Sequence, residues 1–380
     1  MESKSIASEL AVYSVWTDRC YRLRFLLYTF MITLCVGLMS SCSKDGDTVY
    51  VQDPDDVPNT SPLVIVVYDP NSMGDHSYND LVYEGVETAA RQYGLRTLQG
   101  APSSTTEGLM YLESFLLQMS TPPDTIRRLL IVVGNAYDEY LRQNNHRLES
   151  NPYIDLLYLE TDTPLEGKGS TLYIHYYGAM FEAGALAPHF ADEALLVGAN
   201  PQYKAIEECI EGFTAGFNSG LFPTDHTLSL QTAYISNRID GGFIVADSTA
   251  LRILTSYQWT QDLPLLVPIC GGSSIVFQRL AETLNNFFYM GVDAATTSVF
   301  CPYSAIKHVD LAVASCISQW FLNKSLPKHM TFGLDDGYTD VVIHDITNNL
   351  YPFLYKGDLT NSLRTSIHEE AIRKEAEYGR

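Results

Sequence analysis

Buried strands alternate with amphipathic helices along most of this chain, and that order constrains its fold more than any other feature. The first strand is LVIVVYD at 63–69, an uninterrupted apolar and β-branched run typical of a parallel sheet covered on both faces. A helix follows at 80–94, where apolar residues form one stripe before a glycine. Further elements are predicted at 107–119 (helix), 127–134 (strand), from Tyr137 (helix) and at 154–161 (strand). This order predicts a doubly wound α/β sheet.

The alternation then begins a second time. Strands are predicted at 171–177, 194–199, 230–236, 263–270 and 287–293, with helices at 178–188, at 205–218, after Asp247 and after the GGSS run at 271–274. Two series of this kind predict two lobes, and 380 residues suffice for two domains of ordinary size.

The expected boundaries follow from these two series. Lobe 1 is expected to comprise 62–165 plus 302–327, and lobe 2 to comprise 170–298 plus 330–360. The remaining 361–380 would form a polar C-terminal helix or tail. Hinge connections are expected at 162–171, 297–303 and 326–331.

The N-terminus has the pattern of an export signal. Arg19, Arg22 and Arg24 precede an apolar run at 25–39. That run is shorter than the roughly 20 residues a helix needs to cross a bilayer, so a signal peptide over 1–41 is favoured over a permanent transmembrane helix. Cys42 follows small residues and resembles the acylated cysteine of a bacterial lipobox; an ordinary secretory signal is the alternative.

The segment 42–61 is polar, acidic and rich in proline, and it has too little apolar surface to fold alone. We expect it to act as a flexible tether. Its acidic residues directly after Cys42 resemble the surface-export signal of Bacteroidetes lipoproteins. The sequence therefore predicts a lipid-anchored envelope protein, on either the periplasmic face or the outer surface.

Charge and cysteine spacing exclude several classes of partner. The formal net charge is −21, and no stretch concentrates Lys and Arg, so nucleic acid is not an expected partner. The seven cysteines show no CxxC or Cys/His spacing, so neither a metal nor a cofactor is predicted. The four cysteines after Cys42 lie in apolar segments and are expected to be buried thiols, with one disulfide as the alternative.

In open α/β sheets a ligand binds beyond the carboxyl ends of the strands, so the residues there are the candidates for a site. In chain order they are Asp69, Tyr78, Asn135, Asp138, Phe243, Gly271, Gly272, Asp293 and Lys307. Two aromatic rings can sandwich a planar heterocycle, and carboxylates with an ammonium can bind vicinal hydroxyls. Taken singly, the carboxylates could be helix caps, the rings core residues and the lysine a surface charge.

The segment 69–94 resembles the opening signature of the basic membrane protein family. The matching residues are Asp69, Asp75, Ser77, Tyr78, Asn79, Glu84 and Gly85. Four later segments, 179–190, 197–217, 289–314 and 331–343, resemble family motifs in the same order; in the third of these the family pattern is a Ser-x-x-Lys helix start. The resemblance thus spans nearly the whole folded part.

This resemblance implies a nucleoside site. In purine nucleoside receptors of the family, two aromatic rings hold the base, and carboxylates and a lysine hold the ribose. Carried over, the rings would be Tyr78 and Phe243, and Asp293 and Lys307 would hold the ribose. A backbone amide would come from Gly271 or Gly272, and Asp69, Asn79, Asn135 and Asp138 would complete the cleft.

Three departures leave the base undefined. Pro70 stands where the family often has Asn, and it offers neither a side-chain hydrogen bond nor a backbone N–H. The usual Ala-Gly-Gly-Thr-Gly run is CGGSS at 270–274, and the segment around Phe243 matches poorly.

The expected fold is therefore the two-lobed periplasmic-binding-protein type I fold, with the ligand in the interlobe cleft. The expected protein is a monomeric receptor that binds a nucleoside and passes it to an ABC permease. A surface sensor or scavenging lipoprotein of the same fold, with a different ligand and no dedicated transporter, is an alternative. A nucleoside-processing enzyme is another, although the sequence shows no nucleophile with a base and no catalytic residue is predicted.

Overall fold

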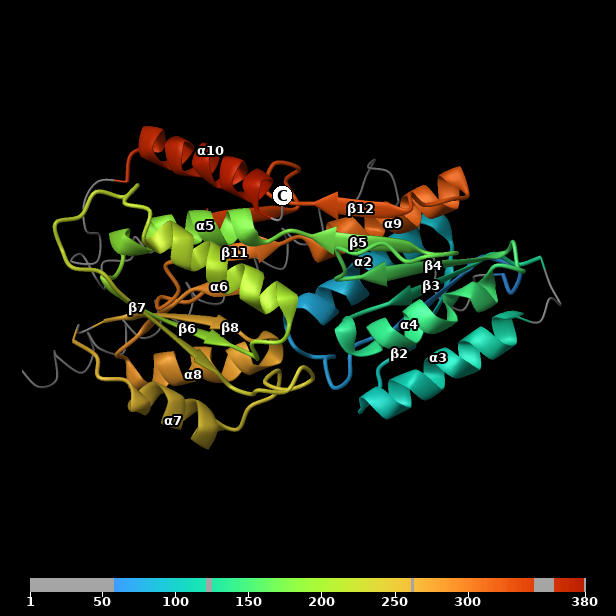
Figure 1. The fold of residues 1–380 in the computed structure, drawn as a ribbon, viewed down its shortest axis with the longest axis horizontal. Helices are drawn as coiled ribbons and strands as arrows, with labels where there is room; N and C mark the ends of the chain where they lie inside the picture. The colour runs from blue at the N-terminus through green and yellow to red at the C-terminus, as the bar shows by residue number, and fades with distance from the viewer. Residues whose placement is uncertain (1–57, 121–124, 261–262, 345–358, 379–380) are drawn as a thin grey trace, which may run out of the picture. The chain divides into compact units, whose positions relative to one another are not determined.

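The computed structural model describes residues 58–120, 125–260, 263–344 and 359–378 (Figure 1). The predicted signal peptide, Cys42 and most of the tether lie outside these ranges. Within them, none of the helices is both long enough and apolar enough to cross a membrane.

Six parallel strands form the sheet of the first lobe, in the order β12-β5-β4-β3-β1-β2. They are β1 (Leu63–Val67), β2 (Arg96–Gly100), β3 (Arg128–Val132), β4 (Ile154–Leu159), β5 (Ser170–Ile174) and β12 (His329–Phe332). The covering helices are α2 (Tyr78–Tyr93), α3 (Thr105–Ser120), α4 (Asp138–Asn144) and α9 (Val309–Asn323), with 3-10 turns η2 (Asn135–Tyr137) and η3 (Asn145–Leu148).

Both faces of this sheet are buried. Val64 and Val66 of β1 pack in one core with α2 and α9. Ile65 and Val67 point the other way and pack in a second core with α3 and α4. Since neither face meets water, β1 carries no polar alternation, as its sequence predicted.

The second lobe contains a parallel sheet in the order β7-β6-β8-β9 and a three-stranded sheet in the order β10-β11-β13. The strands are β6 (Glu193–Gly198), β7 (Ser229–Tyr234), β8 (Leu265–Ile269), β9 (Phe288–Tyr289), β10 (Gly291–Asp293), β11 (Tyr303–Lys307) and β13 (Thr339–Ile343). Helices α5 (Tyr177–Leu186) and α6 (Lys204–Phe217) cover one face, and α7 (Asp247–Ser256) and α8 (Ser274–Leu284) cover the other (Figure 1). The α/β class and the two parallel-sheet lobes are confirmed.

The strand pairings correct the predicted boundaries. β5 pairs with β4, and β12 pairs with β5, so both belong to the first lobe, although their residues were expected in lobe 2. β11 pairs with β10 and β13 and so belongs to the second lobe, although 302–307 was expected in lobe 1. An apolar run shows that a strand is buried, but it does not show which sheet the strand joins.

The three crossings between the lobes therefore lie after β5, β11 and β12, whereas the predicted hinges lay before these strands. They run through 175–176 after β5, through 308 after β11 and through 333–338 after β12. Two local predictions are also corrected. The residues Ser304–Lys307 belong to strand β11 and do not start a helix. Strand β2 was not predicted, because it is a half-exposed edge strand without a continuous apolar run.

The four cysteines of the described residues, Cys209, Cys270, Cys301 and Cys316, are buried free thiols. This agrees with the thiols expected from their apolar sequence contexts. The alternative of a disulfide among them is wrong.

A C-terminal helix, α10 (Asn361–Glu377), lies against α5 of the second lobe (Figure 1). Its Glu375 carboxylate accepts the backbone N–H of Gly178 at 2.7 Å and that of Leu334 at 2.8 Å. Gly178 follows the first crossing and Leu334 lies within the third, so one carboxylate ties two crossings together.

Replacing Glu375 by Gln should destabilise the protein by about 1–2 kcal/mol, because one amide oxygen cannot replace two carboxylate oxygens and one N–H loses its acceptor. Urea denaturation measures the change. The matched control is Glu377→Gln on the same helix, whose carboxylate pairs only with the half-exposed Arg373 and Lys374 and should contribute little. Equal effects of the two variants would contradict the role given to Glu375.

Candidate ligand-binding site

A cavity of about 350 Å³ lies where the carboxyl ends of strands from both lobes meet. Such a volume is within the range of small-molecule sites. Its wall includes eight of the ten residues predicted from the sequence, namely Asp69, Tyr78, Asn79, Phe243, Gly271, Gly272, Asp293 and Lys307.

The loop from 70 to 77 forms one wall and is held by the start of α2. The Asp75 carboxylate accepts the backbone N–H of Ser77 at 2.9 Å and that of Asn79 at 3.1 Å. It also accepts the side-chain amide of Asn79 at 2.9 Å, which fixes the orientation of that amide. The Asn79 Oδ1 atom is buried and has no hydrogen-bond partner in the part of the chain that the structure describes. It is therefore an unpaired acceptor beside the cavity, covered by the surrounding protein.

Lys307, the last residue of β11, forms a buried ion pair with Glu160 of the first lobe. Its Nζ atom lies 2.7 Å from Glu160 Oε1, and each side chain is only 4% exposed. Burial alone would lower the pKa of Lys307, but the carboxylates of Glu160 and Asp293 outweigh it and raise that pKa. The Nζ atom also lies 5.3 Å from the ring centroid of Tyr78 and 5.6 Å from that of Tyr176. The ammonium is thus held charged between two rings.

Asp293 ends β10 and reaches across the cavity. Its Oδ2 accepts the hydroxyl of Ser77, in the first lobe, at 2.5 Å, and its backbone N–H donates to the Tyr176 hydroxyl at 3.0 Å. Burial raises the pKa of Asp293, although Lys307 and Ser77 oppose the rise. Asp293 and Glu160 both have left-handed backbones, with φ of 67° and 62°. Such conformations are costly for these residues and cluster at functional sites.

Asp69 follows β1 and faces Glu160. Burial, followed by the nearby charges of Glu160 and Asp75, raises the pKa of Asp69 to about 7. Its carboxyl group lies against Gly134, where a Cβ atom would come within 2.1 Å of Asp69 Cγ. Gly134 has φ of 86°, so this position needs glycine for both its backbone and its space.

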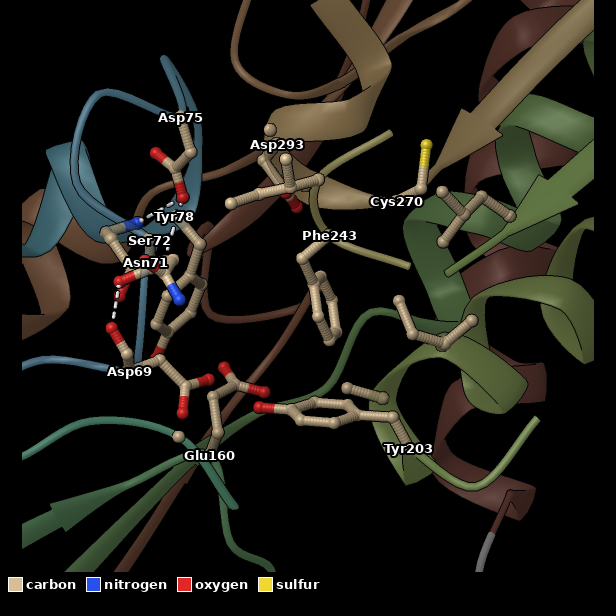
Figure 2. Close-up of a pocket in the computed structure, with 18 of the residues that line it drawn as sticks. Asp69, Asn71, Ser72, Asp75, Tyr78, Glu160, Tyr203, Phe243, Cys270 and Asp293 are labelled. Carbon is tan, nitrogen blue, oxygen red and sulfur yellow. Dashed lines mark hydrogen bonds between the residues drawn. The ribbon is translucent and has the colours of Figure 1, made fainter. Parts of the chain in front are cut away.

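Aromatic rings reach the cavity from both lobes. Tyr78 belongs to the first lobe, and Phe243 and Tyr203 belong to the second, where their rings meet edge to face with centroids 5.5 Å apart. In Figure 2 the Tyr203 hydroxyl points toward the carboxylates of Asp69 and Glu160. Tyr78 and Phe243 thus come from opposite sides, as a pair enclosing a ligand must.

The two glycines after β8 pack closely against Phe243 of the same lobe, and Gly272 lies beside Asp75 of the first lobe. A Cβ atom on Gly272 would lie 3.4 Å from Asp75 Cβ, and one on Gly271 would lie 3.2 Å from Phe243 Cδ1. Gly271 also has a left-handed backbone, with φ of 52°. Side chains at these two positions would press on Phe243, whose carbonyl oxygen would lie 3.2 Å from a Cβ atom on Gly272.

Two predicted residues do not line the cavity. Asp138 begins α4, and both its oxygens accept from Arg142 Nε, at 3.0 and 2.8 Å. Asn135 takes part through its main chain, which hydrogen-bonds to the Tyr203 hydroxyl. Asn135 begins η2 and Asp138 follows it, and it is Gly134 and Ala136 of this turn that line the cavity instead.

Sequence reasoning missed Glu160, Tyr176 and Tyr203. Glu160 directly follows β4, so the strand-end rule would have found it. Tyr203 lies five residues beyond β6, just before α6, and Tyr176 lies in the first crossing. For these two, the sequence carried no signal that separates them from the other tyrosines.

A further contact crosses between the lobes near this cavity. Lys204, the first residue of α6, pairs with Asp162 beyond β4. Ser77–Asp293, Lys307–Glu160, Tyr173–Glu208 and the bond between the Tyr203 hydroxyl and the Asn135 main chain also join the two lobes.

No protein-family model and no curated protein matches this chain. Solved structures do match. An ABC transporter solute-binding protein from Aeropyrum pernix has a TM-score of 0.62 at 17% identity, covering 83% of this chain and 90% of its own. A transcriptional activator of the comK gene from Bacillus halodurans has a TM-score of 0.59 at 12% identity, covering 84% and 99%.

A third match is GanP, a glucose-galactose binding protein from Geobacillus stearothermophilus, with a TM-score of 0.52 at 15% identity, covering 76% of this chain and 99% of its own. At these identities the matches establish the fold. The chain has the two-lobed α/β fold of periplasmic solute-binding proteins.

Proposed function

We propose that this protein is a lipid-anchored receptor that captures a small solute, a nucleoside, between its two lobes. The observation that carries the proposal is the cavity in which Lys307 and Asp293 of the second lobe lie beside Tyr78 of the first. These residue types were expected together from the resemblance to basic membrane proteins. Their meeting in one cavity supports the ligand class.

The chemistry of the wall suits a nucleoside. The Asp293 carboxylate can accept from vicinal hydroxyls, and Lys307 can donate to ring or hydroxyl oxygens. Tyr78 and Phe243 can stack on a planar base, each adding about 0.5–1.5 kcal/mol beyond the buried area. Pro70 and the 270–274 turn leave the identity of the base open.

The remaining parts of the proposal concern the envelope. Cys42 would carry the acyl anchor after removal of 1–41, on the periplasmic face or the outer surface. An ABC permease would receive the solute from a monomeric receptor. Both parts draw on the lipobox-like N-terminus and on the family resemblance, and two of the matched structures are named as ABC transporter solute-binding proteins.

A second candidate is a surface sensor or scavenging lipoprotein of the same fold, with a different ligand and no dedicated transporter. It is favoured by one of the matched structures, which is named as a transcriptional activator. Genes for a permease and an ATPase beside this one would support transport, and their absence would favour the sensor.

A thermal-shift panel tests the ligand, using the chain from Ser43 onward with nucleosides, bases, sugars and vitamins. A ligand at 100 times its dissociation constant should add about 2.7 kcal/mol of stability. We expect nucleosides to raise the melting temperature and free ribose to leave it unchanged. If no nucleoside raises the melting temperature at millimolar concentration, the proposal that the ligand is a nucleoside is wrong.

The same samples also test for chemistry. Chromatography after incubation should recover the nucleoside intact, because the proposal is binding alone. Release of free base and ribose would establish a processing enzyme instead.

A further inference from the structure

Exposed aliphatic side chains from both lobes line the mouth of the cavity, beside the exposed polar residues Asn71 and Asp240. Met73, Ile239 and Ile244 all line the cavity, yet their side chains are 37%, 46% and 68% exposed. Met73 comes from the first lobe and the two isoleucines from the second. Lys307 and Glu160, in contrast, are almost completely buried. The cavity thus runs from a charged inner end to an aliphatic entrance.

The loop that presents the isoleucines is firmly braced. Asn200, which is fully buried, donates through Nδ2 to the carbonyl oxygens of Ile239 at 3.1 Å and Gly241 at 2.9 Å. The Ser273 hydroxyl donates to the carbonyl of Gly242 at 2.8 Å. Gly242 has φ of 91° and passes so close to Ala199 that a Cβ atom would come within 2.0 Å of its oxygen. The backbone of this loop is thus held in place at 239–242, directly before Ile244.

The opposite loop is braced as well. The Ser72 hydroxyl donates to the Asp69 carbonyl at 2.6 Å, on one side of Met73. On the other side, the backbone N–H groups of Gly74 and His76 donate to the Asp80 carboxylate at 2.8 and 2.9 Å. Both lobes therefore fix an exposed aliphatic side chain at the same entrance.

Clustered exposed apolar side chains on fixed backbone usually mark a contact surface. We propose that Met73, Ile239 and Ile244 form an apolar subsite for a hydrophobic substituent of the bound solute. The proposal rests on the proposed function and deepens it. The ligand class becomes an amphipathic nucleoside, in which a polar core binds near Lys307 and an alkyl, aryl or thioether group lies at the mouth. Such a group is held by burial and dispersion alone.

The alternative for these side chains is a gate. In that case they would meet one another when the lobes close and would exclude water without touching the ligand. A gate would affect all ligands equally, whereas a subsite affects only those that carry the substituent. This difference makes the two distinguishable.

The test is calorimetric titration of three probes into the chain from Ser43 onward. Adenosine has no apolar substituent, N-benzyladenosine carries one on the base, and methylthioadenosine carries one on the sugar. We expect at least one substituted probe to bind about tenfold more tightly than adenosine, a difference of about 1.4 kcal/mol.

Two variants locate the effect. Ile244→Ser and Met73→Ser should each remove most of that tenfold gain while leaving adenosine binding within about twofold. Because both side chains are exposed, neither variant should unfold the protein. Leu322→Ser is the matched control, since this leucine is 62% exposed on α9 and does not line the cavity. It should change none of the three affinities.

Three outcomes would overturn the proposal. If adenosine binds and neither substituted probe binds more tightly, the subsite is wrong while the proposed function stands. If the two variants weaken all three probes equally, the side chains form a gate. If no probe binds, the nucleoside function has failed and the subsite fails with it.

Discussion

Lys307→Met should destabilise the protein by about 3–5 kcal/mol and abolish its response to ligand. The Lys307 ammonium is the partner of the Glu160 carboxylate at 2.7 Å, and both side chains are 4% exposed. Removing the cation leaves a charge buried without compensation, which costs far more than the intact pair contributes. Urea denaturation without ligand measures the loss of stability, and a thermal-shift assay measures the loss of binding.

A double variant separates the two effects. Lys307→Met with Glu160→Gln removes both charges, so most of the lost stability should return. Ligand binding should not return, because the proposed donor to the ligand is still missing. If the single variant is as stable as the wild type, Lys307 does not compensate a buried charge on Glu160. If the double variant binds nucleoside, Lys307 does not contact the ligand.

Asp69→Asn should stabilise the protein above pH 7 by about 2–3 kcal/mol. In the fold the pKa of Asp69 is about 7, whereas an ordinary aspartate has a pKa near 3.9. At a pH between these two pKa values, the Asp69 carboxyl group is therefore protonated in the folded state and ionised in the unfolded state. The free energy of unfolding of the wild type therefore falls as the pH rises from about 4 to about 7. Above pH 7, where Asp69 is ionised in both states, it stays at this lower value. Asparagine has the same shape and does not ionise.

Denaturation curves at pH 4, 5, 6, 7 and 8 provide the measurement. The difference between Asp69→Asn and wild type should be small at pH 4, grow to about pH 7 and then level off. The control is Asp138→Asn, whose carboxylate is paired with Arg142 outside the cavity. It should not stabilise the protein, because it loses the ion pair with Arg142. A difference that is independent of pH would mean that Asp69 is ionised throughout this range.

The sequence predicted the layers of this fold better than its connections. Strands such as β1, β3 and β8 are buried on both faces, and continuous apolar runs report that directly. β5 is buried in the same way, but its lobe depends on its pairing with β4, and the lobe of the partly exposed β12 depends on its pairing with β5. No local pattern encodes these pairings.

The candidate site shows a similar limit. Asp69, Asp293 and Lys307 stand at strand ends, where topology brings them together, and the strand-end rule places them in the cavity. Asp138 also follows a strand, but η2 intervenes and the carboxylate pairs with Arg142 instead. Tyr203 reaches the cavity through a turn whose direction depends on packing. Spacing alone does not predict such a turn.

The polar contacts that cross between the lobes have a consequence for affinity. Ser77–Asp293, Lys307–Glu160 and Lys204–Asp162 are made by protein groups alone, so part of the free energy of lobe closure comes from the chain itself. The apparent dissociation constant of a ligand is its intrinsic value divided by the fraction of molecules that are competent to bind. Lys204 does not line the cavity, yet its substitution would alter that fraction. Selection could therefore adjust how tightly this receptor holds its solute without changing any residue that the solute touches.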